Sequence, residues 1–164
     1  MLEDKVKHVV GVADMKISNR PGDLIVTHAL GSCLGVAVYD PVAKVGGILH
    51  VMMPASQINP EKAQQQPLMF VDTALPVFFK SIYRLGGVKK RLEVRVAGGA
   101  NVQSTAADRF AIGKRNYNML KKMFWKNGVL ITAEDVGGNK ARTMFLNLED
   151  GQCWLTNAGK KWSL

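Results

Sequence analysis

Short apolar runs separated by turn residues occupy most of the chain and predict mainly β-structure. Runs rich in Val, Ile and Leu and bounded by Gly, Pro or Asp are typical of strands. Such runs predict strands at residues 6–17, 24–26, 34–39, 46–52, 92–97, 129–136, 142–148 and 152–155. A bend is expected at Gly11, and a turn at residues 149–151 makes a hairpin of the last two strands.

A first amphipathic helix is predicted over residues 71–85. Its apolar face is formed by residues three or four positions apart, namely Val71, Leu75, Phe78, Ile82 and Leu85. Asp72 is the expected N-cap and Gly86 the expected stop. Pro76 cannot donate a backbone hydrogen bond, so a kink or a later start is expected there.

A second helix is predicted from Ile112 to the Asn127-Gly128 pair, which is typical of a helix end. Its buried face is expected to contain Ile112, Asn116, Met119, Leu120 and Met123. Asn116 is polar, so it needs hydrogen-bond partners if it is buried. We expect Asn116 to hold the neighbouring loop in place rather than to act directly in catalysis.

The order of these elements predicts the fold class. Strands come first, followed by helix, strand, helix and further strands, without the regular alternation of a doubly wound parallel sheet. We therefore expect an α/β (α+β) sandwich of mixed, largely antiparallel sheets with two main helices packed outside. The 164 residues suggest one domain, with loose ends at residues 1–5 and 159–164. Residues 55–67 lack an apolar stripe and are expected to form a surface loop, or a flap that helps to select the substrate.

Charge and composition narrow the range of partners. The chain has 22 basic and 13 acidic residues, and its net charge of +9 suits a solvated surface or attraction to an acidic partner. Among the possible acidic partners nucleic acid is the least favoured, because the sequence contains no nucleic-acid-binding motif. No apolar run approaches the about 18 residues of a membrane span, so direct membrane insertion is not expected. Two cysteines and no signal-like start favour a reducing cytoplasm.

Candidate chemistry is concentrated in residues 27–54. Cys33 follows a Gly-Ser turn at the end of one predicted strand, and His50 lies 17 positions later in another. An imidazole within hydrogen-bond reach of a thiol can take its proton and later pass it to a leaving amine. Thr27 could orient that imidazole, and backbone N–H groups of residues 31–33, including those of Gly31 and Ser32, could face a developing oxyanion.

Spacing alone leaves other interpretations open. A cysteine in an apolar run is more often a small core residue, and a strand histidine is more often structural. His28 competes with His50 as the base, although strand alternation directs it away from the face that Thr27 occupies. Cys153 is most simply a core thiol, and no Cys-His spacing suggests a metal site.

Several motifs in order along the chain resemble the CheD family, the chemoreceptor glutamine deamidases of bacterial and archaeal chemotaxis. The pattern T-x-x-L-G-S-C is met by residues 27–33, and GG-x-x-H is met by residues 46–50. Further blocks are Gly98-Gly99-Ala100, Ile112-Gly113-x-Arg115-Asn116 and Asp135-x-Gly137-Gly138-x-x-x-Arg142. Leu34-Gly35 departs from the Val-Ala that is common in the family after the cysteine.

The resemblance implies a cysteine hydrolase that converts receptor glutamines to glutamates without a cofactor. It implies Cys33 as nucleophile, His50 as base and Thr27 as the third polar member, with Gly98 and Gly99 as a wall of the site. The implied substrate is the helical cytoplasmic bundle of methyl-accepting receptors, and a CheC-type phosphatase is the implied regulator. Two rival functions are a binding module that controls such a phosphatase and a thiol hydrolase acting on receptor methyl esters. A redox-sensing cysteine is a weaker third.

Overall fold

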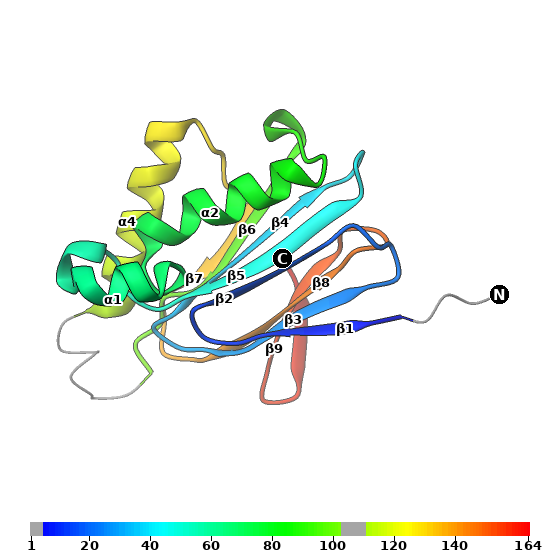
Figure 1. Cartoon of the computed structure of the whole chain (residues 1–164). Coiled ribbons are helices and arrows are strands. Elements are labelled where there is room, and N and C mark those ends of the chain that lie inside the picture. The colour runs from blue at the N-terminus through cyan, green and yellow to red at the C-terminus, as the bar shows by residue number, and fades with distance from the viewer. Residues whose placement is uncertain (1–4, 103–110) are drawn as a thin grey trace.

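The computed structural model describes residues 5–102 and 111–164, whose strands form two five-stranded sheets (Figure 1). The first sheet contains, in spatial order, β1 (Lys7–Val10), β3 (Leu24–Leu30), β8 (Arg142–Asn147), β9 (Cys153–Asn157) and β10 (Lys160–Ser163). The second contains β2 (Asp14–Ser18), β5 (Val45–Val51), β4 (Leu34–Asp40), β6 (Glu93–Gly98) and β7 (Ala133–Val136). Only the β1–β3 and β6–β7 pairs of these described strands are parallel, so the expected mixed, largely antiparallel sheets are confirmed.

Two long helices, α2 (Val71–Arg84) and α4 (Ile112–Asn127), cover the face of the second sheet that points away from the first (Figure 1). A short helix, α1 (Pro60–Gln65), precedes them, and the described segments also contain the 3-10 turns η1 (Ser56–Ile58), η2 (Pro67–Met69) and η3 (Lys89–Arg91). The two main helices are therefore outside the sandwich, as predicted. No helix in the described ranges is long and apolar enough to cross a membrane.

Alternating side chains of β4 divide the interior into two cores. Leu34, Val36 and Val38 pack in a core beneath the helices, while Ala37 and Tyr39 pack in a core between the sheets. Every residue of β4 is buried, because both faces of this central strand are covered. This explains why its sequence is a continuous apolar run without polar alternation.

The prediction of one bent strand over residues 6–17 is wrong. These residues form β1 and β2, which belong to different sheets. Between them Ala13 adopts φ 57°, and its N–H donates to the carbonyl of His50 at 2.9 Å. The chain therefore crosses from one sheet to the other beside the strand that carries His50.

The prediction of a loop at residues 55–67 is also wrong, because this segment contains η1, α1 and the start of η2. The Asn59 side chain accepts a hydrogen bond from the Lys62 N–H, and Pro60 occupies the first turn of α1. Ala63 is the one buried residue of α1. A helix that buries so little needs no apolar stripe, which is why the sequence of α1 shows none. These local capping signals decide the structure here.

The first long helix begins differently from the prediction. Phe70 is its N-cap, and the carboxylate of Asp72 instead accepts hydrogen bonds from the backbone and hydroxyl of Ser56, at 2.9 and 2.7 Å. Pro76 lies inside α2 on its exposed side, and the helix starts no later than expected. The predicted stop is confirmed, since Gly86 adopts φ 102° directly after the helix.

The C-terminal region is more ordered than the sequence predicts. The expectation of a loose end at residues 159–164 is wrong, because β10 pairs with β9 along its length. Residues 129–132 precede β7, so the strand predicted over 129–136 is shorter. The β8–β9 hairpin and the end of α4 at Gly128 are confirmed. Apart from Lys5, the predicted loose N-terminus lies outside the described residues.

Candidate active site

Cys33 lies in the tight corner between β3 and β4, at one end of the sandwich. Its carbonyl accepts a hydrogen bond from the N–H of Gly99 at 2.9 Å, and the carbonyl of Gly31 accepts one from Ala100 at 2.8 Å. The corner is therefore held by the loop that follows β6. Cys33 itself is partly exposed and packs against the edge of the core between the sheets.

His50 and Thr27 come from opposite sheets and meet in this core. Thr27 Oγ1 lies 2.7 Å from His50 Nδ1, and the two residues are 0% and 2% exposed. The Thr27 hydroxyl donates its one hydrogen to the carbonyl of Val10 at 2.9 Å. The imidazole must therefore donate from Nδ1, which leaves Nε2 as the unprotonated nitrogen; this tautomer is assigned from the hydrogen-bond network.

The unprotonated nitrogen of His50 belongs to the same inner face as Cys33. Gly35 is directly opposite His50 in the β4–β5 register, and Cys33, in the bend just before β4, packs against the same core between the sheets. His50 Nε2 is buried and has no hydrogen-bond partner within the described ranges, so no bond joins it to the thiol here. Catalytic hydrogen bonds are often long in unliganded enzymes and tighten when substrate binds.

Gly35 is the departure from the family pattern, and its surroundings are closely packed. A Cβ at this position would lie 2.7 Å from Leu30 Cδ1 and 3.1 Å from Met144 Sδ. Leu30 therefore occupies the space that a side chain at position 35 would need. The absence of a side chain opposite His50 is compensated by this leucine.

His28 lies on the other side of β3. Its side chain is exposed, whereas Thr27 beside it is buried against His50. The alternation expected from the sequence thus separates the two histidines. Only His50 of the pair is in contact with Thr27.

Asn116 of α4 connects the corner of Cys33 with the strand of His50. It is 0% exposed, and its Nδ2 donates to the carbonyls of Ser32 and Met52 at 3.0 and 3.1 Å. The reversed amide would place an oxygen against two carbonyl oxygens, so the observed orientation is the consistent one. Its Oδ1 is buried without a partner in the described part of the chain. Asn116 was expected to hold one neighbouring loop, and the structure shows that it holds both the corner at Ser32 and the segment after β5 at Met52.

The paired glycines after β6 permit a close approach to the Cys33 backbone. Gly98 adopts φ 108°, and a Cβ there would lie 2.1 Å from the Cys33 carbonyl oxygen. Gly99 already uses its N–H on that oxygen. By contrast, the amides of Ser32 and Cys33 donate to no backbone carbonyl among the described residues, so they are the available donors for an oxyanion.

A second network supports this wall. The sequence places Asp135 and Arg142 in one family-like block but assigns no role to either residue. Arg142 donates to the carbonyls of Gly98 and Gly137 at 3.3 and 2.7 Å and pairs with Asp135 at 3.0 Å. The other oxygen of Asp135 accepts from the indole of Trp162 at 2.7 Å. Trp162 belongs to the segment that the sequence predicts as a loose tail in which Trp162 could dock, but no local signal links it to Asp135.

Burial keeps both reactive groups neutral near pH 7. Desolvation raises the pKa of the Cys33 thiol to about 11, and its own backbone N–H acts in the opposite direction. Desolvation also lowers the pKa of His50 to about 4. The resting pair is therefore a thiol and a free-base imidazole rather than a preformed ion pair. No group of three or more His, Cys, Asp or Glu side chains suited to a metal occurs in residues 5–102 and 111–164.

The neutral thiol leads to a prediction about its reactivity. In a Cys153→Ala background, alkylation of Cys33 by iodoacetamide at pH 7 should be on the order of 10²-fold slower than that of free cysteine, because the thiolate reacts. The rate should still rise between pH 8 and pH 10 because the thiol pKa is about 11. Mass spectrometry at a series of pH values measures it. A rate that is already constant near pH 7 would instead indicate a preformed thiolate.

Comparison with known proteins agrees with the resemblance seen in the sequence. Residues 52–157 match the family described as "CheD chemotactic sensory transduction". The chain is 47% identical over 151 residues to "Probable chemoreceptor glutamine deamidase CheD 1" of Syntrophus aciditrophicus, covering 92% of this chain and 94% of that protein. It is 42% identical over 156 residues to "Probable chemoreceptor glutamine deamidase CheD" of Solibacter usitatus, covering 95% and 92%. The family match begins after His50, but the alignments with both relatives include residues 27–50.

Proposed function

Because the chain belongs to the CheD family of chemotaxis proteins, we propose that it deamidates glutamine side chains of chemoreceptors, with Cys33 as nucleophile. The observation that carries the proposal is the hydrogen bond between Thr27 and His50, which leaves Nε2 of His50 free to accept a proton. That nitrogen lies on the same inner face as Cys33. A nucleophile, a base and a residue that orients the base are thereby available together.

In the first half of the reaction, His50 Nε2 takes the proton of the Cys33 thiol as the sulfur attacks the side-chain amide carbon of glutamine. The amides of Ser32 and Cys33 donate to the oxygen that becomes negative. The imidazolium then gives its proton to the amide nitrogen, and ammonia leaves. The product of this half is a thioester between Cys33 and the former glutamine side chain.

In the second half, water replaces ammonia. His50 Nε2 accepts a proton from water, whose oxygen attacks the thioester carbon, and the proton returns to sulfur as the thiol leaves. Glutamate and the starting enzyme are formed, and no external cofactor is consumed. Because both groups rest in their neutral forms, charge separation is expected only when bound substrate excludes water and supplies the oxyanion.

The surface beside the reactive corner suits a helical, partly acidic substrate. A shallow groove of about 280 Å³ lies between the segment after β5 and α4, and its lining includes Ala55, Arg115, Met119 and Lys122. Asn116, which follows Arg115, reaches the carbonyl next to Cys33. We therefore propose that receptor helices are recognised here in the cytoplasm, with the α1 region helping to select the glutamine. A CheC-type phosphatase is a further proposed partner.

The test is the mass of receptor peptides after incubation of a folded receptor fragment with the protein. Conversion of amide to acid at particular glutamines, with release of ammonia, is the expected result. Cys33→Ala should abolish the conversion, and Cys153→Ala should retain it, because Cys153 is buried in the core between the sheets.

Three other results would contradict the proposal. Conversion that persists in Cys33→Ala would assign the reaction to another group. Release of methanol from a methylated receptor, without ammonia from the amidated one, would identify an ester hydrolase. Unchanged receptor with folded wild-type protein would favour a binding module.

A further inference from the structure

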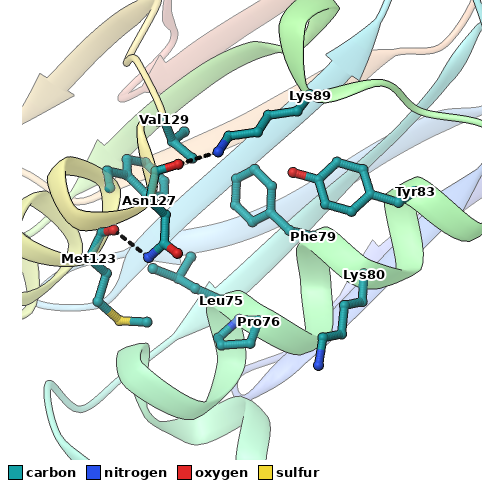
Figure 2. A pocket seen from close by; sticks show the side chains of 10 residues that line it. Leu75, Pro76, Phe79, Lys80, Tyr83, Lys89, Met123, Asn127 and Val129 are labelled. Atoms are coloured by element: carbon teal, nitrogen blue, oxygen red, sulfur yellow. Dashed lines mark hydrogen bonds between the residues drawn. The ribbon is translucent and has the colours of Figure 1, made fainter.

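A groove with a volume of about 480 Å³ lies between α2, from Leu75 to Tyr83, and the C-terminal end of α4, as shown in Figure 2. None of its lining residues belongs to the corner that carries Cys33. Both helices begin at the reactive end, where Val71 donates to the carbonyl of Met53 and Asn116 reaches Ser32. After α2 the chain reaches the opposite end of β4, where the Val88 N–H donates to Asp40. We call this cavity the distal groove.

The floor of the distal groove is apolar and aromatic. Leu75, Phe79 and Phe124 form it, and the two phenylalanine rings pack edge to face with centroids 5.8 Å apart. Met123 and Tyr83 line the sides, and Tyr83 is 37% exposed. Figure 2 shows the rings of Phe79 and Tyr83, both from α2, beside the groove between α2 and α4. Grooves with aromatic and methionine side chains are suited to the apolar face of an amphipathic helix.

The rim of the distal groove is cationic. Lys80 and Lys89 line it, and none of its lining residues in the described structure is acidic. Neither lysine forms an ion pair within the described ranges, although the Lys89 ammonium donates to the carbonyl of Asn127. A second copy of this chain would bring the same rim and a net charge of +9, so charge disfavours self-association here. An occupant with carboxylates beside its apolar residues is complementary.

We propose that the distal groove binds an amphipathic helix of an acidic protein partner. Apolar side chains of that helix pack on Phe79 and Phe124, and its carboxylates lie against Lys80 and Lys89. The partner is held at the end of the helical layer opposite Cys33, so the reactive corner stays open while it is bound. The proposal does not depend on the chemistry of Cys33, and failure of one leaves the other intact.

The test uses a labelled synthetic peptide with Leu or Phe at positions i, i+3, i+4 and i+7 of a helix and Glu at the exposed positions between them. Fluorescence anisotropy should show saturable binding to the wild-type protein. Lys80→Glu and Met123→Lys should each weaken it by about tenfold or more, because one reverses the rim charge and the other puts a charge beside the floor. Lys160→Glu, which makes the same charge change as Lys80→Glu on exposed β10, should change it by less than about twofold.

Controls separate binding in the distal groove from binding elsewhere on the protein. Circular dichroism confirms that each variant is folded, and a peptide with Lys in place of Glu should not bind. Equal weakening by Lys160→Glu would mean non-specific attraction to a basic protein. Protection of Cys33 from alkylation by the peptide would place it at the reactive corner, and a dimer that Met123→Lys dissociates in sedimentation would mean that a second copy occupies the groove. Each of these three results overturns the proposal.

Discussion

Replacing His50 with glutamine should lower the rate of receptor deamidation at saturating substrate by about 10²–10⁴-fold. Glutamine keeps a similar side-chain volume at this position, but its amide cannot accept the thiol proton and return it to ammonia. Since the pKa of His50 is about 4, the wild-type rate should fall on the acid side only as the pH approaches that value, where Nε2 becomes protonated.

His28→Gln is the matched control, because it makes the same change on the adjacent, exposed side of β3. Its deamidation rate should stay close to that of the wild type. Ammonia release measured over a range of receptor concentrations separates the turnover rate from binding. Loss of activity in His28→Gln, with His50→Gln nearly unaffected, would show that the base had been assigned to the wrong histidine.

Replacing Asn116 with alanine should both destabilise the protein and slow its turnover. The carbonyls of Ser32 and Met52 lose their donors, and leaving buried polar groups unsatisfied costs about 2–4 kcal/mol in total. Urea unfolding measures that loss. Because the two carbonyls belong to the segments that carry Cys33 and His50, the turnover rate should fall more than the affinity for the receptor.

Asn118→Ala provides the control on the same helix, since Asn118 is exposed. It should leave the free energy of unfolding near the wild-type value. Because Asn118 lines the groove proposed for the receptor, its turnover is compared at saturating receptor concentration. If Asn116→Ala is destabilised but turns over substrate normally under conditions where it is folded, the amide contributes only to stability. Asn116→Asp adds a sharper comparison, because a carboxylate of the same shape cannot donate to either carbonyl when ionised.

Periodicity predicted the framework of this fold well. The apolar face of α2, the end of α4 at Gly128 and the continuous apolar run of β4 are local signals, and each was interpreted correctly except at Leu85, which follows α2 and is exposed. Two of the failures share a cause. The split of residues 6–17 between two sheets, and the pairing of β10 with β9, depend on partners outside the local pattern of each segment. The helix α1 was missed for a different reason, since only one of its residues is buried.

The candidate site likewise has features that were visible in the sequence and features that only the fold reveals. Thr27, Cys33 and His50 occur in one short stretch, so their motif could be seen in the sequence, and the structure adds the 2.7 Å contact between Thr27 and His50. The carbonyl of Val10, which determines the tautomer of His50, could not be anticipated from its position before a turn. Asn116 was expected to hold one loop, but its reach to both reactive segments appears only when α4 is placed on the sheet.

The hydrogen bond between Thr27 and His50 crosses from one sheet to the other, which has a consequence for the newly made chain. Cys33 and His50 belong to early segments, but Thr27 is held in place by β8, which begins at Arg142. Contacts between residues so distant in the sequence form late, because long loops must close first. The hydrogen bond that fixes the His50 ring is thus expected to form only after nearly the whole chain has been synthesised. A ribosome-bound fragment that lacks β8 carries Cys33 and His50 while β3 is paired with β1 alone, so the two layers are expected to dock only after β8 has been added.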